Sequence, residues 1–333
     1  MEIEQVGKSY GRKMMAGALL SKGMRISEVK VGKSLKRLDP VSQQRREETA
    51  GRTLNPKYYT ANYFGHKVHI DQNEKLVMFG VTHVMARDGY SGMIIATSTM
   101  AVKNNLIIYE EIYKHFTLKY GLWDQLRVDR GGEFALICHV QETLRDHRRN
   151  TSIDPFKCTK STDNNIIERM WVEVNSRVNY PIKSVLSQFV QNGNIDMSLD
   201  EVKFAVSWVT CRVSSIGLKL FAQAWNHHLV PKKGRPIDLM KSNNKAMRIQ
   251  NLMTKEEAAE HYTAITGGNL TVWSQFGIDP LLDFPELKRR RENEILRKCN
   301  FENMFYDIQQ GQSENFLYCI KLFLRVTGAV MVA

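Results

Sequence analysis

The chain has 333 residues, of which 43% are hydrophobic and 25% are charged. This composition excludes a disordered protein, and the length allows one large domain with flanking modules or two to three domains. The formal net charge of +12 favours a polyanionic partner, either a nucleic acid or an anionic membrane surface. A basic enzyme without such a partner is the alternative that charge alone leaves open.

The cysteines and the two ends of the sequence exclude several further classes. No CxxC pair occurs among the five cysteines, so neither a zinc finger nor a disulfide framework is predicted, and a reducing compartment fits. The N-terminal sequence has no apolar run behind its charges, so we expect no signal peptide. Segment 316–333 is apolar but carries Lys321 and Arg325, which favours a buried terminal segment over a tail anchor. We therefore predict no membrane partner.

Two short helices are expected at the start of the chain. The first covers about Tyr10–Ser21 and ends at Gly23; Ser27 is placed to cap a second helix, which Pro40 stops. This pattern predicts a helix-turn-helix module over residues 1–40, although an αα-hairpin with a solvated basic face fits equally well. The second helix carries the basic side chains expected to meet phosphates: Lys30, Lys33, Lys36 and Arg37.

A linker and three strands are expected next. Residues 41–61 are polar and lack periodicity. KVHID alternates between apolar and polar residues, LVMFGVTHVMA is an apolar run long enough for a central strand, and GMIIATSTM is typical of a third strand. The dipeptide Asp88-Gly89 marks a tight turn, so the second and third strands are expected to be antiparallel.

Helices and strands alternate after this block. We expect a helix over about 102–119, a strand at DQLRVD, a helix over 134–145, and a fifth strand at TSID. A strongly amphipathic helix begins near Asp163, and another helix covers 199–213. From about Gly217 the pattern is less periodic, apart from the charged helical stretch LKRRRENE. The order predicts an α/β protein with a mixed five-stranded sheet and flanking helices.

Three acidic residues stand out by their positions. Asp71 ends or lies within the first strand, Asp129 closes the fourth and is followed by two glycines, and Glu168 lies in the first turns of the amphipathic helix. Taken singly, an aspartate before a turn is usually a turn former, and Glu168 is typical of a solvated helix face. Together they indicate a carboxylate cluster at one edge of the sheet. Carboxylates suit Mg²⁺, and two such ions can support phosphodiester cleavage and strand transfer.

Three motifs around these acids resemble a known family. HIDQNEKL, VDRGGEF and NNIIERMW resemble, in this order, the acidic motifs of the integrase catalytic core that retroviral integrases and many transposases share. The sequence is most similar to eukaryotic integrase-core proteins derived from DNA transposons, in which the first motif resembles HIDGNHKL and a turn resembles IDGYSR. Here these read HIDQNEKL and RDGYSG. The resemblance covers about Tyr10–Met240 and includes the helix-turn-helix.

The resemblance implies an RNase H-like fold, with the catalytic core over residues 62–240 and a C-terminal region, 241–333, of unknown role. It implies a two-metal polynucleotidyl transferase in which Asp71, Asp129 and Glu168 bind Mg²⁺ or Mn²⁺. DNA ends and target DNA would be the partners, with a homo-oligomer assembled on them in the nucleus. The chain departs from the family at Gln72, where a glycine is common, and it has no N-terminal His/Cys zinc module like that of retroviral integrases.

Several other residues are weaker candidates. Lys160, Asn165 and Arg169 are placed to contact DNA, whereas solvated surface charge is the commoner role of such lysines and arginines. The KRRR run within LKRRRENE is either a nuclear localisation signal or a solvated helix surface. We expect structural roles for three further groups: Asp88, Glu133, and the pair His227 and His228. Two other functions stay open, namely an inactive, transposon-derived nucleic-acid-binding protein and an RNase H-type nuclease acting on RNA–DNA hybrids.

Overall fold

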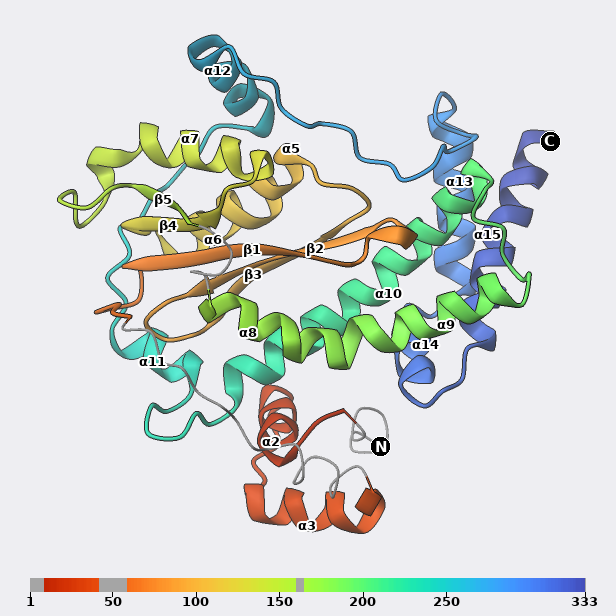
Figure 1. Cartoon of the computed structure of the whole chain (residues 1–333), viewed down its shortest axis with the longest axis horizontal. Coiled ribbons are helices and arrows are strands. Elements are labelled where there is room, and N and C mark those ends of the chain that lie inside the picture. Colours follow the sequence, from red (N-terminus) through yellow and green to blue (C-terminus); the bar gives the residue numbers. More distant parts are fainter. Residues whose placement is uncertain (1–8, 42–58, 160–164, 333) are drawn as a thin grey trace.

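The computed structural model describes residues 9–41, 59–159 and 165–332, and its centre is a five-stranded sheet (Figure 1). The strands run in the order β3-β2-β1-β4-β5. Their bounds are β1 Lys67–Leu76, β2 Val81–Asp88, β3 Ile94–Met100, β4 Gln125–Asp129 and β5 Phe156–Thr159. The first three strands pair antiparallel, whereas β4 pairs parallel with β1 and β5 pairs parallel with β4. This mixed sheet with flanking helices confirms the predicted α/β, RNase H-like fold.

One face of the sheet packs against helices from two parts of the chain. Every second strand residue points to this face, including Val68, Ile70, Leu126 and Val128, and all four are buried. The covering segments are α5 Asn105–Ile107, the π-helical η2 Ile108–Lys114, α6 His115–Tyr120 and α7 Ala135–Thr143, and α12 Lys255–Thr266 packs on α7 and α5. The connection between β3 and β4 therefore supplies most of the helices on this face.

The other face carries a second core built on long helices. Strand residues such as Met85 pack there with the apolar stripe of α8, which includes Ile167, Met170 and Val174. The covering elements are α8 Asn165–Val174, the π-helical η6 Asn175–Asn179, α9 Tyr180–Gln191 and α10 Asp200–His227. The end of α10 is fixed to β3, because the Asn226 side chain exchanges two hydrogen bonds, each 2.8 Å, with the backbone of Ile94.

The two predicted N-terminal helices are present as α2 Arg12–Ser21 and α3 Glu28–Leu38. The hydroxyl of Ser27 accepts a hydrogen bond from the backbone of Lys30, as predicted for the cap. Helix α2 packs closely on α10, since a Cβ at Gly17 would lie 2.3 Å from the Ala224 carbonyl oxygen. Helix α3 lies on the outer side of α2 (Figure 1), and its predicted phosphate-binding side chains are all exposed: Lys30, Lys33, Lys36 and Arg37. The predicted linker lies largely outside the described residues.

The C-terminal region is more helical than its sequence pattern suggests. Beyond the short α11 Pro236–Ser242 it forms α13 Pro285–Lys298, α14 Phe301–Gln309 and α15 Glu314–Val332, and the last two pack on α10. The apolar end of the chain is thus a helix with a buried side, as predicted. Within the described residues, one helix, α10, is long and apolar enough to cross a membrane by composition; 67% of its most apolar window is buried inside the protein, as in a core helix.

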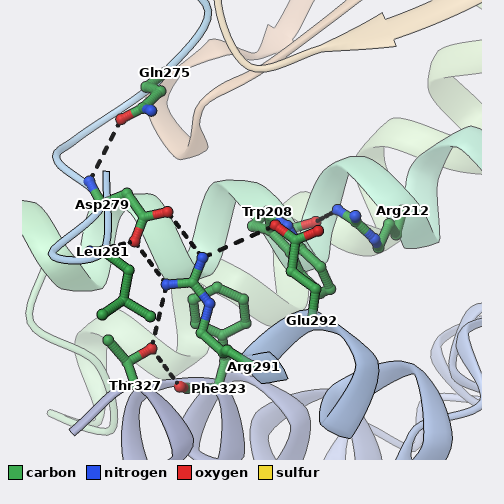
Figure 2. Close-up of polar contacts among 9 residues, drawn as sticks. All are labelled: Trp208, Arg212, Gln275, Asp279, Leu281, Arg291, Glu292, Phe323 and Thr327. Atoms are coloured by element: carbon green, nitrogen blue, oxygen red, sulfur yellow. Dashed lines mark hydrogen bonds and ion pairs between the residues drawn. The ribbon is translucent and has the colours of Figure 1, made fainter. Parts of the chain in front are cut away.

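A buried ion pair ties the segment before α13 to the C-terminal helices (Figure 2). The guanidinium of Arg291 donates to both carboxylate oxygens of Asp279, at 2.6 and 2.8 Å, and both side chains are fully buried. The ring of Phe323 lies 4.3 Å from the guanidinium carbon. Arg291 belongs to the KRRR run, so the prediction that this whole run is solvated surface is wrong at that residue, because Asp279 draws it into the interior.

Three predicted elements differ from the structure. The run LVMFGVTHVMA is not one strand: it contains the end of β1, a 3-10 turn at Val77–Phe79, Gly80 with a φ of 65°, and the start of β2. The fifth strand begins at Phe156 rather than within TSID, which forms a turn. The helix predicted for 199–213 continues to His227, since its apolar stripe extends past Gly217 against Phe305 of α14.

Breaking the buried ion pair should be costly. We expect Arg291→Met to lower the free energy of unfolding by about 3–5 kcal/mol, because the Asp279 carboxylate would stay buried without its partner. Urea denaturation measures this. The double variant Arg291→Met/Asp279→Leu removes both charges and should recover most of the loss. Arg289→Met is the control, since its ion pair with Glu286 is exposed and should be worth less than about 1 kcal/mol. A similar small loss for both single variants would contradict the prediction.

Candidate active site

Asp71 is a buried carboxylate in β1 and is fixed from two sides. Its Oδ1 accepts a hydrogen bond from the backbone N–H of Gln72 at 2.8 Å, and its Oδ2 accepts one from the indole Nε1 of Trp171 at 3.0 Å. Trp171 belongs to α8, so this bond holds α8 against β1. Glu168 lies three residues before Trp171 and therefore on the same side of the helix, one turn away. The hydrogen bond thus brings the region of Glu168 towards Asp71.

Asp129 ends β4 beside Asp71. In the parallel pairing of the two strands, His69 lies opposite Arg127. Asp71 and Asp129 each follow these residues by two positions, so both carboxylates lie on the same face of the sheet. Among the described residues, the Oδ1 atom of Asp129 is buried and has no hydrogen-bond partner. A buried acceptor without a donor costs about 1–3 kcal/mol, and a carboxylate oxygen is the ligand type that Mg²⁺ prefers.

The electrostatics connect the three predicted carboxylates. Burial raises the pKa of Asp71 to about 7, and the negative charges of Asp129 and Glu168 contribute to this rise. Burial also raises the pKa of Asp129. The negative charge of Glu133 raises this pKa further, and the positive charge of Lys103 lowers it. The carboxylates of Asp129 and Glu168 therefore both lie within electrostatic reach of Asp71.

The three carboxylates lie near one another but are not arranged as ligands around one metal position. In residues 9–41, 59–159 and 165–332, no group of three or more His, Cys, Asp or Glu side chains is arranged to hold a metal ion as it stands. Carboxylates that share a site repel one another when no cation is present. Glu168 is half-buried on the side of α8.

The loop after Asp129 is held by residues from the β3–α5 connection. The Asn105 amide donates to the carbonyl oxygens of Gly132 and Glu133, at 2.8 and 3.0 Å. The Lys103 ammonium lies 3.7 Å from the Glu133 carboxylate and 3.1 Å from that of Glu74. Lys103 therefore forms ion pairs with two acidic side chains at the edge of the site. Glu133 takes the structural role that we predicted for it.

A buried polar network fixes the helix that follows Glu168. Asn73 donates to the side chain of Asn175, and Asn179 donates to the side chains of both, at 2.8 to 3.0 Å. The His83 ring contacts the side-chain Oδ1 of Asn179 at 3.0 Å and the Thr99 hydroxyl at 2.8 Å. Burial lowers the pKa of His83 to about 4, so the ring is neutral near pH 7. The network joins β1, β2 and β3 to the π-helical turn directly after α8.

The remaining predicted residues have different outcomes. Lys160 lies outside the described residues, Asn165 begins α8, and Arg169 is exposed next to Glu168. Asp88 is structural as predicted, because its carboxylate accepts hydrogen bonds from Gly65, Tyr90, Ser91 and Trp123. The Nδ1 atoms of the two neighbouring histidines, His227 and His228, contact backbone carbonyl oxygens of their own helix.

Sequence reasoning missed several residues around the carboxylates. Trp171 was predicted only as part of a buried stripe, and its hydrogen bond to Asp71 has no sequence signature. Lys103 and Asn105 lie between predicted elements, where a single basic or amide residue carries little information. Asn73 lies within the HIDQNEKL motif, and the four-residue spacing of Asn175 and Asn179 placed them on one helix side, so a polar contact could have been anticipated there.

Comparison with known proteins identifies the same region. A family model described as "Integrase core domain" matches residues 59–258. No curated protein matches the chain. Among solved structures, the chain is similar to one chain in the cryo-electron microscopy structure of the simian T-cell lymphotropic virus intasome in complex with the PP2A regulatory subunit B56 gamma. The identity is 13% and the TM-score is 0.33, with 71% of this chain and 78% of that chain covered.

The raised pKa of Asp71 predicts how stability changes with pH in the metal-free protein. The folded state holds a proton up to about pH 7, whereas an unfolded aspartate releases it near pH 4, so the free energy of unfolding should fall as pH rises through this window. Asp71→Asn removes this titration and should flatten the curve, gaining on the order of 1–2 kcal/mol over the wild type at pH 8. Urea denaturation in EDTA measures both.

Asp238→Asn on α11 is the matched control, because this carboxylate is exposed and should leave the pH dependence unchanged. An Asp71→Asn curve that runs parallel to the wild-type curve would show that Asp71 is ionised normally.

Proposed function

The chain belongs to the integrase core domain family, and from this premise we propose that it is a polynucleotidyl transferase that cuts DNA and joins it to other DNA. The observation that carries the proposal is that the carboxylates of Asp129, at the end of β4, and Glu168, on α8, both act on Asp71 in the neighbouring parallel strand β1. Family membership supports the class of reaction, and the three carboxylates mark the site at which we propose that the reaction takes place.

The donor set fits the divalent cations Mg²⁺ and Mn²⁺. All three side chains offer hard oxygen ligands, and the buried Oδ1 of Asp129 lacks a hydrogen-bond partner among the described residues. We propose that Asp71 and Asp129 hold the ions and that Glu168 completes the second site. Two divalent ions, when bound, would activate the attacking oxygen and stabilise the leaving oxygen at the scissile phosphate. Because Asp71 has a pKa of about 7, its carboxylate would lose a proton on binding near neutral pH.

The surrounding side chains would keep these ligands in place. The hydrogen bonds from Trp171 and from the backbone of Gln72 occupy one lone pair on each oxygen of Asp71, which fixes the carboxylate plane. Lys103 holds Glu133 and Glu74 at the rim of the site. Fixed carboxylates matter because a small misplacement of reacting groups can cost about 10²-fold in rate.

The proposed reaction has two displacements at phosphorus. In the first, the oxygen of water bonds to the phosphorus near a DNA end while the bond to the 3′ oxygen breaks, and that oxygen takes up a proton. In the second, the freed 3′-hydroxyl loses its proton and its oxygen bonds to a phosphorus of target DNA, whose own 3′ oxygen leaves. Both displacements place negative charge at the same position, so one carboxylate site serves both.

Three further parts of the proposal concern partners and location. The exposed basic face of α3 would contact DNA, with Lys30 and Lys33 among its phosphate contacts. We propose that the protein acts as a homo-oligomer on paired DNA ends, and that it works in the nucleus. Of the KRRR run, Arg289 and Arg290 are exposed, whereas Arg291 is buried, so only part of the run is available to a transport receptor.

A strand-transfer assay tests the reaction class. With Mn²⁺ or Mg²⁺, the wild type should convert a labelled DNA end into cleaved and joined products, and Asp129→Asn should reduce these to background because a metal ligand is lost. Binding of DNA without any metal-dependent product in the wild type would instead favour the inactive nucleic-acid-binding protein. Cleavage of an RNA–DNA hybrid but not of duplex DNA would favour the RNase H-type nuclease.

Trp171→Phe tests whether the indole positions Asp71. We expect activity or metal affinity to fall about 10- to 100-fold, because a hydrogen bond that orients a ligand is lost while the ring volume is largely kept. Trp225→Phe is the matched control, since its indole also donates one hydrogen bond, to the Gly92 carbonyl oxygen at 2.9 Å, but lies away from the carboxylates. Equal effects of the two variants on activity and on melting temperature would indicate a purely structural role for Trp171.

A further inference from the structure

Three basic side chains form a row across β1, β4 and β5. Arg127 lies opposite Lys157 on one neighbouring strand and opposite His69 on the other. Lys67 precedes His69 by two residues, so its side chain points to the same face. Burial lowers the pKa of Lys67, and the charges of Arg127 and Lys157 lower it further, which places all three within electrostatic reach of one another. We call Lys67, Arg127 and Lys157 the cation row.

The cation row shares its face of the sheet with the carboxylates. Asp129 follows Arg127 by two residues in β4, and Asp71 follows His69 by two residues in β1. Two residues along a strand span about 7 Å, so the row begins one such step from the candidate active site. The buried residues between them, Val128 and Ile70, point to the opposite face. Positive charge therefore lies directly beside the site along the strands.

The arrangement of the row costs stability unless an anion is present. Like charges that lie directly opposite each other on neighbouring strands repel, as Arg127 and Lys157 do. In the described part of the chain, no ion pair with a carboxylate involves any of the three cations, whereas Lys103 has two such pairs. A protein that keeps an unneutralised pair of cations at a sheet edge retains a local cost, which is typical of a binding site.

Aromatic and backbone groups hold two of the cations without neutralising them. The Lys67 ammonium lies 5.6 Å from the centre of the Tyr59 ring, and the Arg127 guanidinium carbon lies 5.7 Å from the same centre. The Lys67 ammonium also donates a 2.8 Å hydrogen bond to the carbonyl oxygen of Thr60. The Arg127 Nε donates to the side chain of Gln125 at 3.2 Å. These contacts orient the cations and leave their positive charge in place.

We propose that the cation row binds the phosphates of the DNA strand that leads to the phosphodiester at the candidate active site. A phosphate supplies the anion that Arg127 and Lys157 lack, and a guanidinium and an ammonium are the side-chain groups that bind phosphate oxygens. Lys157 is exposed and Arg127 is half-buried, so a strand lying on this face meets both. The inference rests on the proposed function for the identity of the strand, and it adds the residues that hold it.

The salt dependence of binding tests this assignment without any cleavage. Arg127→Gln/Lys157→Gln and the wild type are titrated, in EDTA and at several KCl concentrations, with a fluorescein-labelled DNA duplex that has a single-stranded overhang. The slope of log K against log[KCl] should become shallower by about two units, one for each phosphate contact removed. Arg289→Gln/Arg290→Gln removes the same charge from exposed positions of α13 and should leave the slope close to that of the wild type.

The outcomes distinguish phosphate binding by the cation row from a purely structural role of these residues, and they test the row independently of the proposed reaction. The melting temperature of the row variant should equal or exceed that of the wild type, because a like-charge pair is removed; if it does not fold, Lys157→Gln alone should reduce the slope by about one unit. An unchanged slope, or an equal change in the α13 control, overturns the inference. So does a row-dependent slope that appears only with single-stranded RNA. A wild type that binds through the row but never cleaves DNA refutes the proposed function alone.

Discussion

The hydrogen bond from the Trp171 indole to the Asp71 carboxylate joins the two elements on which the candidate active site depends. Carboxylates brought together in a partly buried site repel one another, so the fold must hold them against that repulsion. The indole does so at Asp71, and the apolar stripe of α8 does so for Glu168 by anchoring its helix in the core. Behind them, Asn73, Asn175 and Asn179 fix the start of the next helical segment to the sheet with a closed set of hydrogen bonds.

A π-helical segment, η6, joins α8 to α9 at the polar network. Asn175–Asn179 interrupts the regular α-helical spacing directly after α8, and the buried asparagines of the polar network are its first and last residues. A π-helical turn adds a residue per turn and so rotates the helix on either side of it. Even so, the buried apolar residues of α8 and α9 form one stripe at helical spacing, from Ile167 and Trp171 through Val178 to Val185 and Phe189, and all of them face the same core.

The order of strands and helices along the chain could be predicted because it depends on local pattern, and the three acids were singled out by the motifs around them. Alternating residues specify β1 and β4, and the motifs around Asp71, Asp129 and Glu168 resemble those of one family. The hairpin between β1 and β2 could not be read from hydrophobicity, because the turn at Val77–Phe79 is as apolar as the strands that it joins. The packing of α13 could not be predicted from the pattern, because an arginine is almost never fully buried unless it is paired, and the partner of Arg291 is the distant Asp279.

The active-site face carries a group of carboxylates and a group of cations, and each group needs an ion of the opposite charge. Where Asp129 ends β4 beside Asp71 of β1, the carboxylates repel each other, and Asp129 has an oxygen without a hydrogen-bond partner in the described structure, so cations would stabilise this part of the face. Two residues earlier in β4, Arg127 and its neighbour Lys157 of β5 repel each other, so an anion would stabilise that part of the face. A metal-bound phosphodiester with its strand continuing over the row would meet both requirements at once. Neither an acidic peptide nor a metal ion alone would do so, because each relieves the repulsion at one end only.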